Sequence, residues 1–183
     1  MEQKRLTFNQ KATQDLILLF KCEKLDHVKI RQSVLSGADV NVTIDEKNNL
    51  SPLMISMMKG QSKLSYFLLC YGASPTHFNS LGQDCLEFAI FAGQCKLMDL
   101  LLDLGAKPNR FNGKGETALN LAVKMGNIEM VKSLLRHGAD VNMPSLKVKI
   151  TPLEIAKSRG LREIEKILIG AGAKEKCYNE LVM

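Results

Sequence analysis

The chain of 183 residues is long enough for one domain of ordinary size and too short for two large ones. Hydrophobic residues make up 45% of it and charged residues 24%, which is typical of a globular protein and excludes a disordered or collagen-like chain. Lysine and arginine number 25 against 19 acidic residues, and the net charge of +6 is spread along the chain. Because no block concentrates this charge as a dedicated DNA-binding arm would, the pattern argues against nucleic acid as the partner.

The cysteines and the N-terminal segment indicate a compartment. Five cysteines occur without a CxxC pair, and their odd number and apolar surroundings predict free thiols in a reducing environment. The first residues lead into no apolar signal core, and the longest early apolar run, residues 16–20, is far shorter than a membrane span. We therefore expect a cytoplasmic protein without a transmembrane segment. The nucleus, or delivery into a host cell, is compatible with the same pattern.

Three markers recur along the chain in one register. Gly-Ala dipeptides come every 33 to 35 residues, and two other markers keep that period: a residue type that caps helices, and a lone glycine nine residues after it. The dipeptides begin at Gly37, Gly72, Gly105, Gly138 and Gly172, the capping residues are Ser51, Asp84, Thr117 and Thr151, and the lone glycines are Gly60, Gly93, Gly126 and Gly160. Such a period indicates internal repeats.

Each period predicts two helices and a loop. The capping residue starts a short helix, which the lone glycine ends in the left-handed conformation. A second helix follows, as in the fourth repeat, where Ile128, Val131 and Leu135 share one helical face. In chain order this gives a single domain over 12–174, divided into 12–44, 45–78, 79–111, 112–145 and 146–174, between an N-terminal extension (1–11) and a C-terminal tail (175–183).

The first and last repeats differ from the inner ones. The first lacks the capping triplet, and its second helix, expected over residues 28–36, is predicted to be about one residue short. In the fifth, Lys157, Arg162 and Glu165 stand at positions that are apolar in the fourth. Because terminal units of a stacked array need polar outer faces, these repeats are predicted to be the caps.

The repeated sequence motifs resemble those of one protein family. Thr151-Pro152-Leu153 at the front of a repeat, with Gly37-Ala38-Asp39-Val40-Asn41 and residues 138–142 at the back, is similar to ankyrin repeats over about nine-tenths of the chain. The resemblance implies an all-α ankyrin-repeat solenoid of stacked helix–turn–helix units with extended hairpin loops. It also implies a protein–protein interaction module. The family's histidine after Thr-Pro-Leu is replaced here, by Met54, Glu87, Asn120 and Glu154.

Motifs for catalysis and for metal or cofactor binding are missing from the sequence. There is no HExxH, no GxSxG and no zinc-spaced Cys/His cluster, and the three histidines lie in three different repeats. Residues 113–117 resemble a phosphate loop superficially, but we expect a hairpin tip whose two glycines have positive φ. We expect His137 to cap a helix C-terminus. The sequence thus predicts no enzyme, no cofactor, no metal and no small-molecule substrate.

The resemblance implies binding on a concave face built from loop tips and the ends of the first helices. Those positions combine large apolar residues with cations, so the expected partner is an acidic protein segment with hydrophobic anchors. The predicted partner-binding residues are Lys47, Leu50, Met58, Lys59, Leu81, Phe91, Lys114, Lys124, Met125, Lys147, Val148, Ile150 and Arg159. A competing interpretation assigns Leu50, Leu81 and Ile150 to packing between adjacent loops.

Three classes of function fit these features. The favoured one is a monomeric adaptor, inhibitor or scaffold that binds another protein. A pathogen effector that binds a host protein would use the same physics. The third class binds an anionic membrane or nucleic acid, and it predicts an affinity that falls steeply with salt.

Overall fold

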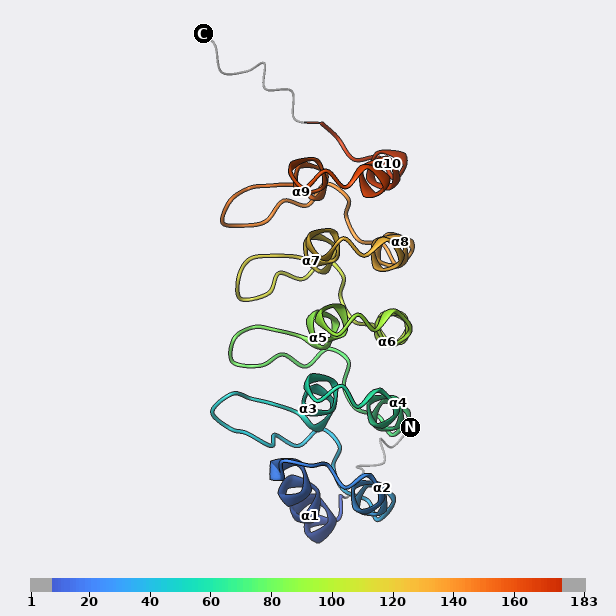
Figure 1. Cartoon of the computed structure of the whole chain (residues 1–183). Coiled ribbons are helices and arrows are strands. Elements are labelled where there is room, and N and C mark those ends of the chain that lie inside the picture. The colour runs from blue at the N-terminus through green and yellow to red at the C-terminus, as the bar shows by residue number, and fades with distance from the viewer. Residues whose placement is uncertain (1–7, 176–183) are drawn as a thin grey trace, which may run out of the picture. The chain divides into compact units, whose positions relative to one another are not determined.

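The computed structural model describes residues 8–175, which contain ten helices and no strand (Figure 1). Residues 1–7 and 176–183, including most of the predicted tail, lie outside the described part. The chain divides into two compact units, Met1–Phe88 (unit 1) and Ala89–Met183 (unit 2). Unit 1 holds α1 (Gln10–Lys21), α2 (His27–Leu35), α3 (Pro52–Met58), α4 (Ser62–Cys70) and the start of α5 (Cys85–Phe91); unit 2 holds the end of α5, α6 (Cys95–Asp103), α7 (Ala118–Met125), α8 (Ile128–Arg136), α9 (Pro152–Ser158) and α10 (Arg162–Gly170). The predicted all-α repeat of helix pairs is confirmed.

The first helix of each inner repeat starts where the capping residues predicted. The Oγ atoms of Ser51 and Thr117 accept the backbone N–H three residues on, and the carboxylate of Asp84 does the same. At the fifth repeat Thr151 forms a complete capping box, because the Glu154 carboxylate accepts the Thr151 N–H at 2.7 Å. The lone glycine follows within two residues of each helix end, with φ between 66° and 68°. Local hydrogen bonding therefore fixes both ends of these short helices.

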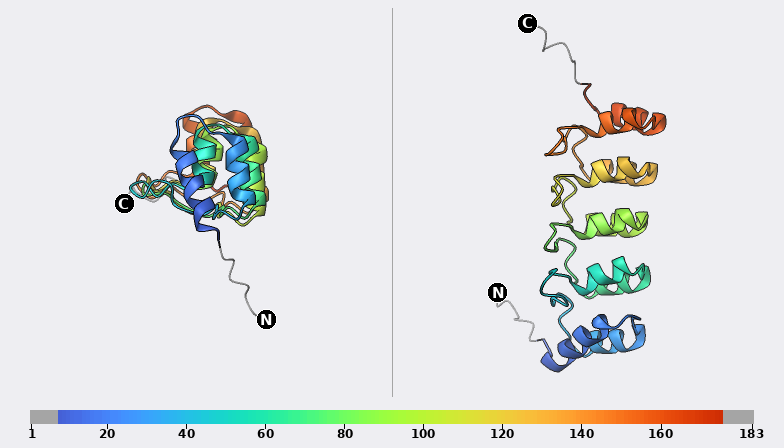
Figure 2. Two further views of the ribbon diagram at one scale, coloured as in Figure 1. Left: turned by 90° about the horizontal axis from the view of Figure 1, so that it is seen from below. Right: turned by 60° about the vertical axis from the view of Figure 1, so that its left-hand side comes forward.

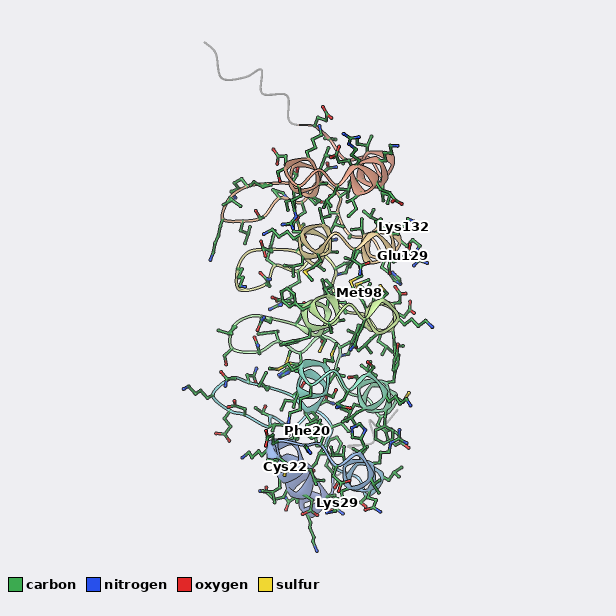
Figure 3. The ribbon with its side chains drawn as sticks, viewed as in Figure 1. Phe20, Cys22, Lys29, Met98, Glu129 and Lys132 are labelled. Atoms are coloured by element: carbon green, nitrogen blue, oxygen red, sulfur yellow. The ribbon has the colours of Figure 1, made fainter. Side chains whose placement is uncertain are left out.

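The second helices supply most of the buried leucines. Leu68, Leu101, Leu134 and Leu168, which lie at equivalent positions of α4, α6, α8 and α10, are fully buried. In unit 2, α8 packs against both α6 and α10, and α7 packs against α9. Figure 3 shows Met98 inside this unit and Glu129 and Lys132 on the outer surface of α8.

The first repeat departs from two expectations. Its second helix is not short: α2 has nine residues, as α4 does, because the Asp26 carboxylate accepts the N–H groups of Val28 and Lys29 and starts the helix at His27. Its first helix is long, with twelve residues against seven in α3. The side chain of Asn9 caps it, so the helix starts at Gln10, inside the segment expected to be an extension.

Asparagine side chains join successive repeats within each unit. The amide of Asn109 donates to the carbonyl of Gly138 at 3.0 Å, and its Oδ1 accepts the Asp140 N–H at 2.7 Å. Asn41 and Asn142 make the same pair of bonds to the repeat that follows each of them. We call this two-bond contact the asparagine clamp; it satisfies the backbone at the end of each second helix.

The loop that ends the second repeat has Thr76 at the position of Asn41, Asn109 and Asn142 in the first, third and fourth repeats. The Thr76 hydroxyl lies 3.2 Å from the Ser74 Oγ, so its side chain bonds within its own loop. The clamp therefore depends on an amide that both donates and accepts, and threonine at this position bonds locally instead.

Removing a clamp should lower stability measurably. We expect Asn109→Ala to reduce the free energy of unfolding by about 1–3 kcal/mol, because two inter-repeat hydrogen bonds are lost. Urea unfolding followed by circular dichroism measures this. Thr76→Ala is the matched control and should cost less than about 0.5 kcal/mol. Equal losses in the two variants would contradict the role given to the clamp.

Asn120 is a polar side chain in the apolar layer of α7. It is fully buried, and neither its Oδ1 nor its Nδ2 has a hydrogen-bond partner among the described residues. Met54 occupies the equivalent position in α3 and is buried as completely. The position thus accepts an apolar side chain in α3, and the unpartnered asparagine in α7 carries a desolvation cost.

Replacing Asn120 by leucine should stabilise the protein. We expect Asn120→Leu to raise the free energy of unfolding by about 1–2 kcal/mol, because an unsatisfied buried amide is removed at nearly constant volume. In contrast, Asn127→Leu should lower it by about 1 kcal/mol, since the Asn127 side chain caps α8. Chemical denaturation of both variants tests the pair, and a loss of stability in Asn120→Leu would show that its amide is satisfied.

Candidate partner-binding surface

The loop tips that precede α3, α5, α7 and α9 project beside their helices as tight turns (Figures 1 and 2). We call them finger 2 (residues 45–50), finger 3 (79–84), finger 4 (112–117) and finger 5 (145–150). In fingers 2, 3 and 4 the first side chain, Asp45, Asn79 or Asn112, accepts two backbone N–H groups of its own tip. Each of these tips is thus held closed by its own hydrogen bonds.

The structure leaves the predicted partner-binding residues accessible. Of the thirteen, Leu50 and Lys124 are half-buried and the other eleven are exposed. Leu81 is 69% exposed, so the interpretation that it packs between loops is wrong for this residue. Leu50 is the member of that group that does pack in part.

Two of the predicted cations serve the fold itself. The Lys59 ammonium donates to the carbonyls of Cys22 and Glu23, at 2.9 and 2.6 Å, and so binds the C-terminal end of α1. Lys124 forms an ion pair with Glu116 of finger 4. This ion pair compensates the charge of Lys124, while the ammonium of Lys59 keeps its charge but is already engaged by backbone carbonyls.

The two fingers of unit 1 meet through the backbone, and finger 2 is acidic. The Ser80 N–H donates to the Asn48 carbonyl at 3.0 Å, and the Ser80 hydroxyl donates to the Lys47 carbonyl at 2.9 Å. Finger 2 contains Asp45 and Glu46 beside Lys47. The Asn48 side-chain amide donates to the Asp45 carboxylate and holds the pKa of that carboxyl below its ordinary value. The basic flank predicted from the sequence is therefore absent at finger 2.

A groove in unit 1 brings four predicted residues together with side chains that the sequence analysis missed. The groove has a volume of about 980 Å³ and lies between α1, finger 2 and α3. Its lining includes the predicted residues Lys47, Leu50, Met58 and Lys59. Phe20, near the end of α1, also lines it and is 3% exposed, and Figure 3 shows Phe20 beside Cys22. The long helix α1 supplies one wall of the groove. The apolar run at residues 16–20 is the feature of the sequence that could have indicated this wall.

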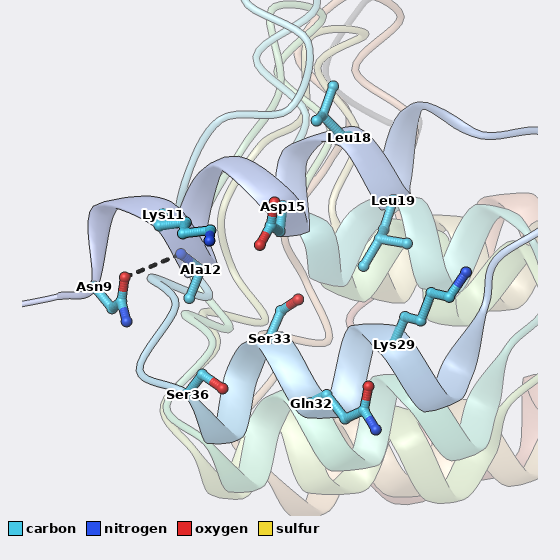
Figure 4. A pocket seen from close by; sticks show the side chains of 10 residues that line it. All are labelled: Asn9, Lys11, Ala12, Asp15, Leu18, Leu19, Lys29, Gln32, Ser33 and Ser36. Carbon is cyan, nitrogen blue, oxygen red and sulfur yellow. Dashed lines mark hydrogen bonds between the residues drawn. The ribbon is translucent and has the colours of Figure 1, made fainter.

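A second groove of about 650 Å³ lies between α1 and α2 (Figure 4). Leu18 and Leu19 line it together with polar side chains such as Lys11, Asp15 and Lys29. None of the thirteen predicted residues takes part in its lining, so it is separate from the predicted face.

In unit 2, fingers 4 and 5 are joined by a backbone bond. The Leu146 N–H donates to the Gly115 carbonyl at 2.8 Å, and a side chain at Gly115 would collide with Leu146. Gly115 has the expected positive φ of 77°, but the expectation for Gly113 is wrong, because the turn needs only one left-handed residue. On finger 5, Leu146, Val148 and Ile150 are 48%, 64% and 39% exposed.

His77, His137 and the buried Cys85 take part in the fold through hydrogen bonds, helix capping and packing. The His77 ring lies 2.9 Å from the Asn49 carbonyl, and His137 is the C-cap of α8, as predicted. Burial raises the pKa of the Cys85 thiol to about 12, with a smaller contribution from the Asp84 charge. Cys85 is therefore protonated at neutral pH and is a poor nucleophile.

The surroundings of His137 favour its charged form and raise its pKa. Its Nδ1 lies 2.8 Å from the Ser133 carbonyl and must donate to it, so a neutral ring would turn a lone pair toward the Asp103 carboxylate, 3.1 Å from Nε2. The hydrogen bond to Ser133 contributes most to raising the pKa of His137, and the charges of Asp103 and Asp99 add to it. The protonated ring links α8 to α6.

Stability should therefore depend on pH through His137. Because the folded state binds this proton more tightly, the contribution is fully present below the ordinary pKa of 6.5 and is lost as the pH rises through the raised value. We expect the stability advantage of the wild type over His137→Gln to shrink between about pH 6 and about pH 8. Urea unfolding of both proteins across this range measures it, and a constant difference would contradict the assignment.

Other kinds of site find no support in the described part of the chain. No group of three or more metal-ligating side chains occurs there. Likewise, no helix among the described residues is long and apolar enough to span a bilayer.

Comparison with known families gives two matches. A family model described as ankyrin repeats (3 copies) matches residues 18–112, and a second, described as ankyrin repeats (many copies), matches residues 101–156. No curated protein matches the chain at a significant level.

Proposed function

Since the chain belongs to the ankyrin repeat family, whose repeats are generally protein–protein interaction modules, we propose that it is a non-catalytic adaptor, inhibitor or scaffold that binds a protein partner. The contact surface is the face made of finger tips and first-helix ends, which is concave in the family. It binds through an apolar seam, and the cations beside it favour an acidic partner. Free of its partner, the protein is a monomer in the cytoplasm.

One observation carries this proposal. Met58, Phe91 and Met125 are the last residues of α3, α5 and α7, and they are 57%, 46% and 53% exposed. The residues just before them in α3 and α5, Met57 and Ile90, are almost fully buried. Two successive repeats thus place a large apolar side chain at the same exposed position, seven residues after the capping residue, and the next repeat places Met125 one residue later. Exposed residues of this kind suit interface anchors.

The groove in unit 1 supports the same surface. Met58 and Leu50 lie in its lining beside the buried Phe20, so a partner side chain that enters there would contact both exposed and core apolar atoms. Deep, well-desolvated pockets of this kind are where hot spots concentrate.

Affinity capture from a cell extract tests the proposal. We expect at least one protein to be retained by the wild type and lost with both Phe91→Ala and Met58→Ala. With that partner purified, each variant should raise Kd about 30-fold, which corresponds to a hot spot of about 2 kcal/mol.

Val28→Ala is the matched control for these variants. Val28 is 67% exposed on α2, away from the finger side, so its removal should leave Kd unchanged. Thermal unfolding of each variant separates lost binding from lost folding. Equal affinity of the wild type and the Phe91 and Met58 variants would remove the seam as the contact surface.

A further inference from the structure

Finger 5 differs in composition from the other three fingers. Its sequence is Ser-Leu-Lys-Val-Lys-Ile, with three aliphatic residues and two lysines in six positions. The corresponding tips of fingers 3 and 4 carry one and no large aliphatic residue. All three aliphatic side chains of finger 5 are exposed, with Val148 the most accessible at 64%.

The backbone of finger 5 holds these side chains outward. The Ser145 N–H donates to the Ile150 carbonyl at 2.9 Å, and the Lys149 N–H donates to the Ser145 carbonyl at 3.0 Å. Lys149 has a φ of 55°, which closes the turn. Because the tip is already folded, binding through it orders little backbone.

Finger 4 extends the positive charge around this tip. The bond from Leu146 to Gly115 brings Lys114, the residue before Gly115, beside finger 5. Among residues 112–117 and 145–150, all of which are described, Glu116 is the one acid, and it is ion-paired with Lys124. The joined tips thus present three lysines and no uncompensated carboxylate.

A convex tip with apolar and basic residues interleaved fits a surface in which charged groups lie directly above hydrocarbon. An anionic lipid bilayer has this structure: aliphatic side chains enter the acyl boundary, while lysine stems extend to the phosphates. A linear acidic peptide offers no cavity to receive Leu146 and Val148 together. Finger 2, with Asp45 and Glu46, would be repelled by the same surface.

We propose that the tip of finger 5 binds the surface of anionic lipid bilayers, with Leu146 and Val148 in the interface and Lys114 and Lys147 at the phosphates. This goes beyond the protein-binding function, because it assigns a second kind of ligand to Lys114, Lys147 and Val148, which also belong to the predicted protein-binding face. A single tip of this size gives weak, reversible binding that depends on salt and on lipid charge.

The chain contains no tryptophan, so one introduced indole reports insertion without background. We expect the fluorescence of the full-length Val148→Trp variant to shift to the blue with vesicles of phosphatidylcholine and 30% phosphatidylserine, and brominated acyl chains to quench it. Leu81→Trp, at a residue 69% exposed on finger 3, is the matched control and should show neither change. Pure phosphatidylcholine vesicles should give no shift with either variant.

Co-sedimentation with the same vesicles tests the residues individually. Lys147→Gln should weaken the partition coefficient about fivefold. Val148→Asp should abolish partition, and Leu81→Asp should leave it unchanged. Partition of Phe91→Ala, the variant expected to lose the protein partner, should equal that of the wild type, so the two proposals fail separately.

Three results would overturn the membrane proposal. They are no partition of the wild type into anionic vesicles at low salt, partition that persists in Val148→Asp, and quenching of the indoles at positions 81 and 148 to the same extent.

Discussion

A helix of seven residues followed by one of nine cannot bury its apolar side alone, and the rest of the structure depends on this. Leu64, Leu97 and Leu134 on the second helices reach full burial only because neighbouring elements cover them. Short helices also gain little stability from intrinsic helix propensity, because the free-energy cost of nucleating a helix offsets what a few hydrogen-bonded turns contribute. Their ends must therefore be fixed by caps, which is why Ser, Asp or Thr begins each inner pair and a left-handed glycine follows its first helix.

The stacking requirement also explains the clamp. The carbonyl at the end of a second helix, such as that of Gly138, faces the loop of the preceding repeat and needs a donor there. The Asn109 amide nitrogen supplies that donor, and its oxygen accepts the N–H of Asp140, two residues after Gly138. One side chain thereby satisfies two backbone groups of a neighbour. Core and clamp positions are not alone in joining repeats, because neighbouring finger tips also share backbone hydrogen bonds and Lys59 binds the end of α1.

Local features of the fold were predictable from sequence, and long-range ones were not. Caps, glycine turns and helical faces depend on residues within four positions of one another. Thr151 therefore predicts the start of α9, and Gly126 predicts the end of α7. The start of α1 was not predicted, because the first repeat lacks the capping triplet and the helix is instead capped by Asn9, before the expected boundary at residue 12. The hydrogen bonds from Lys59 to the end of α1 could not be predicted, because the two carbonyls lie 36 and 37 residues away in the sequence. The same holds for the groove, whose walls come from three separate segments.

The sequence identified exposed positions of the repeat, but it overstated the positive charge that they carry. Positions that the repeat does not use internally could be named from phase alone, and eleven of thirteen are exposed. Counting their cations overstated the basic character, because Lys124 is neutralised by Glu116 and finger 2 is acidic. A charge that the fold already uses is less available to a partner. The tips of fingers 4 and 5 keep their positive charge, because the one carboxylate within them is already paired. In the two proposals, one repeated scaffold therefore carries two different surfaces, an apolar seam at the helix ends and a basic, aliphatic tip at finger 5.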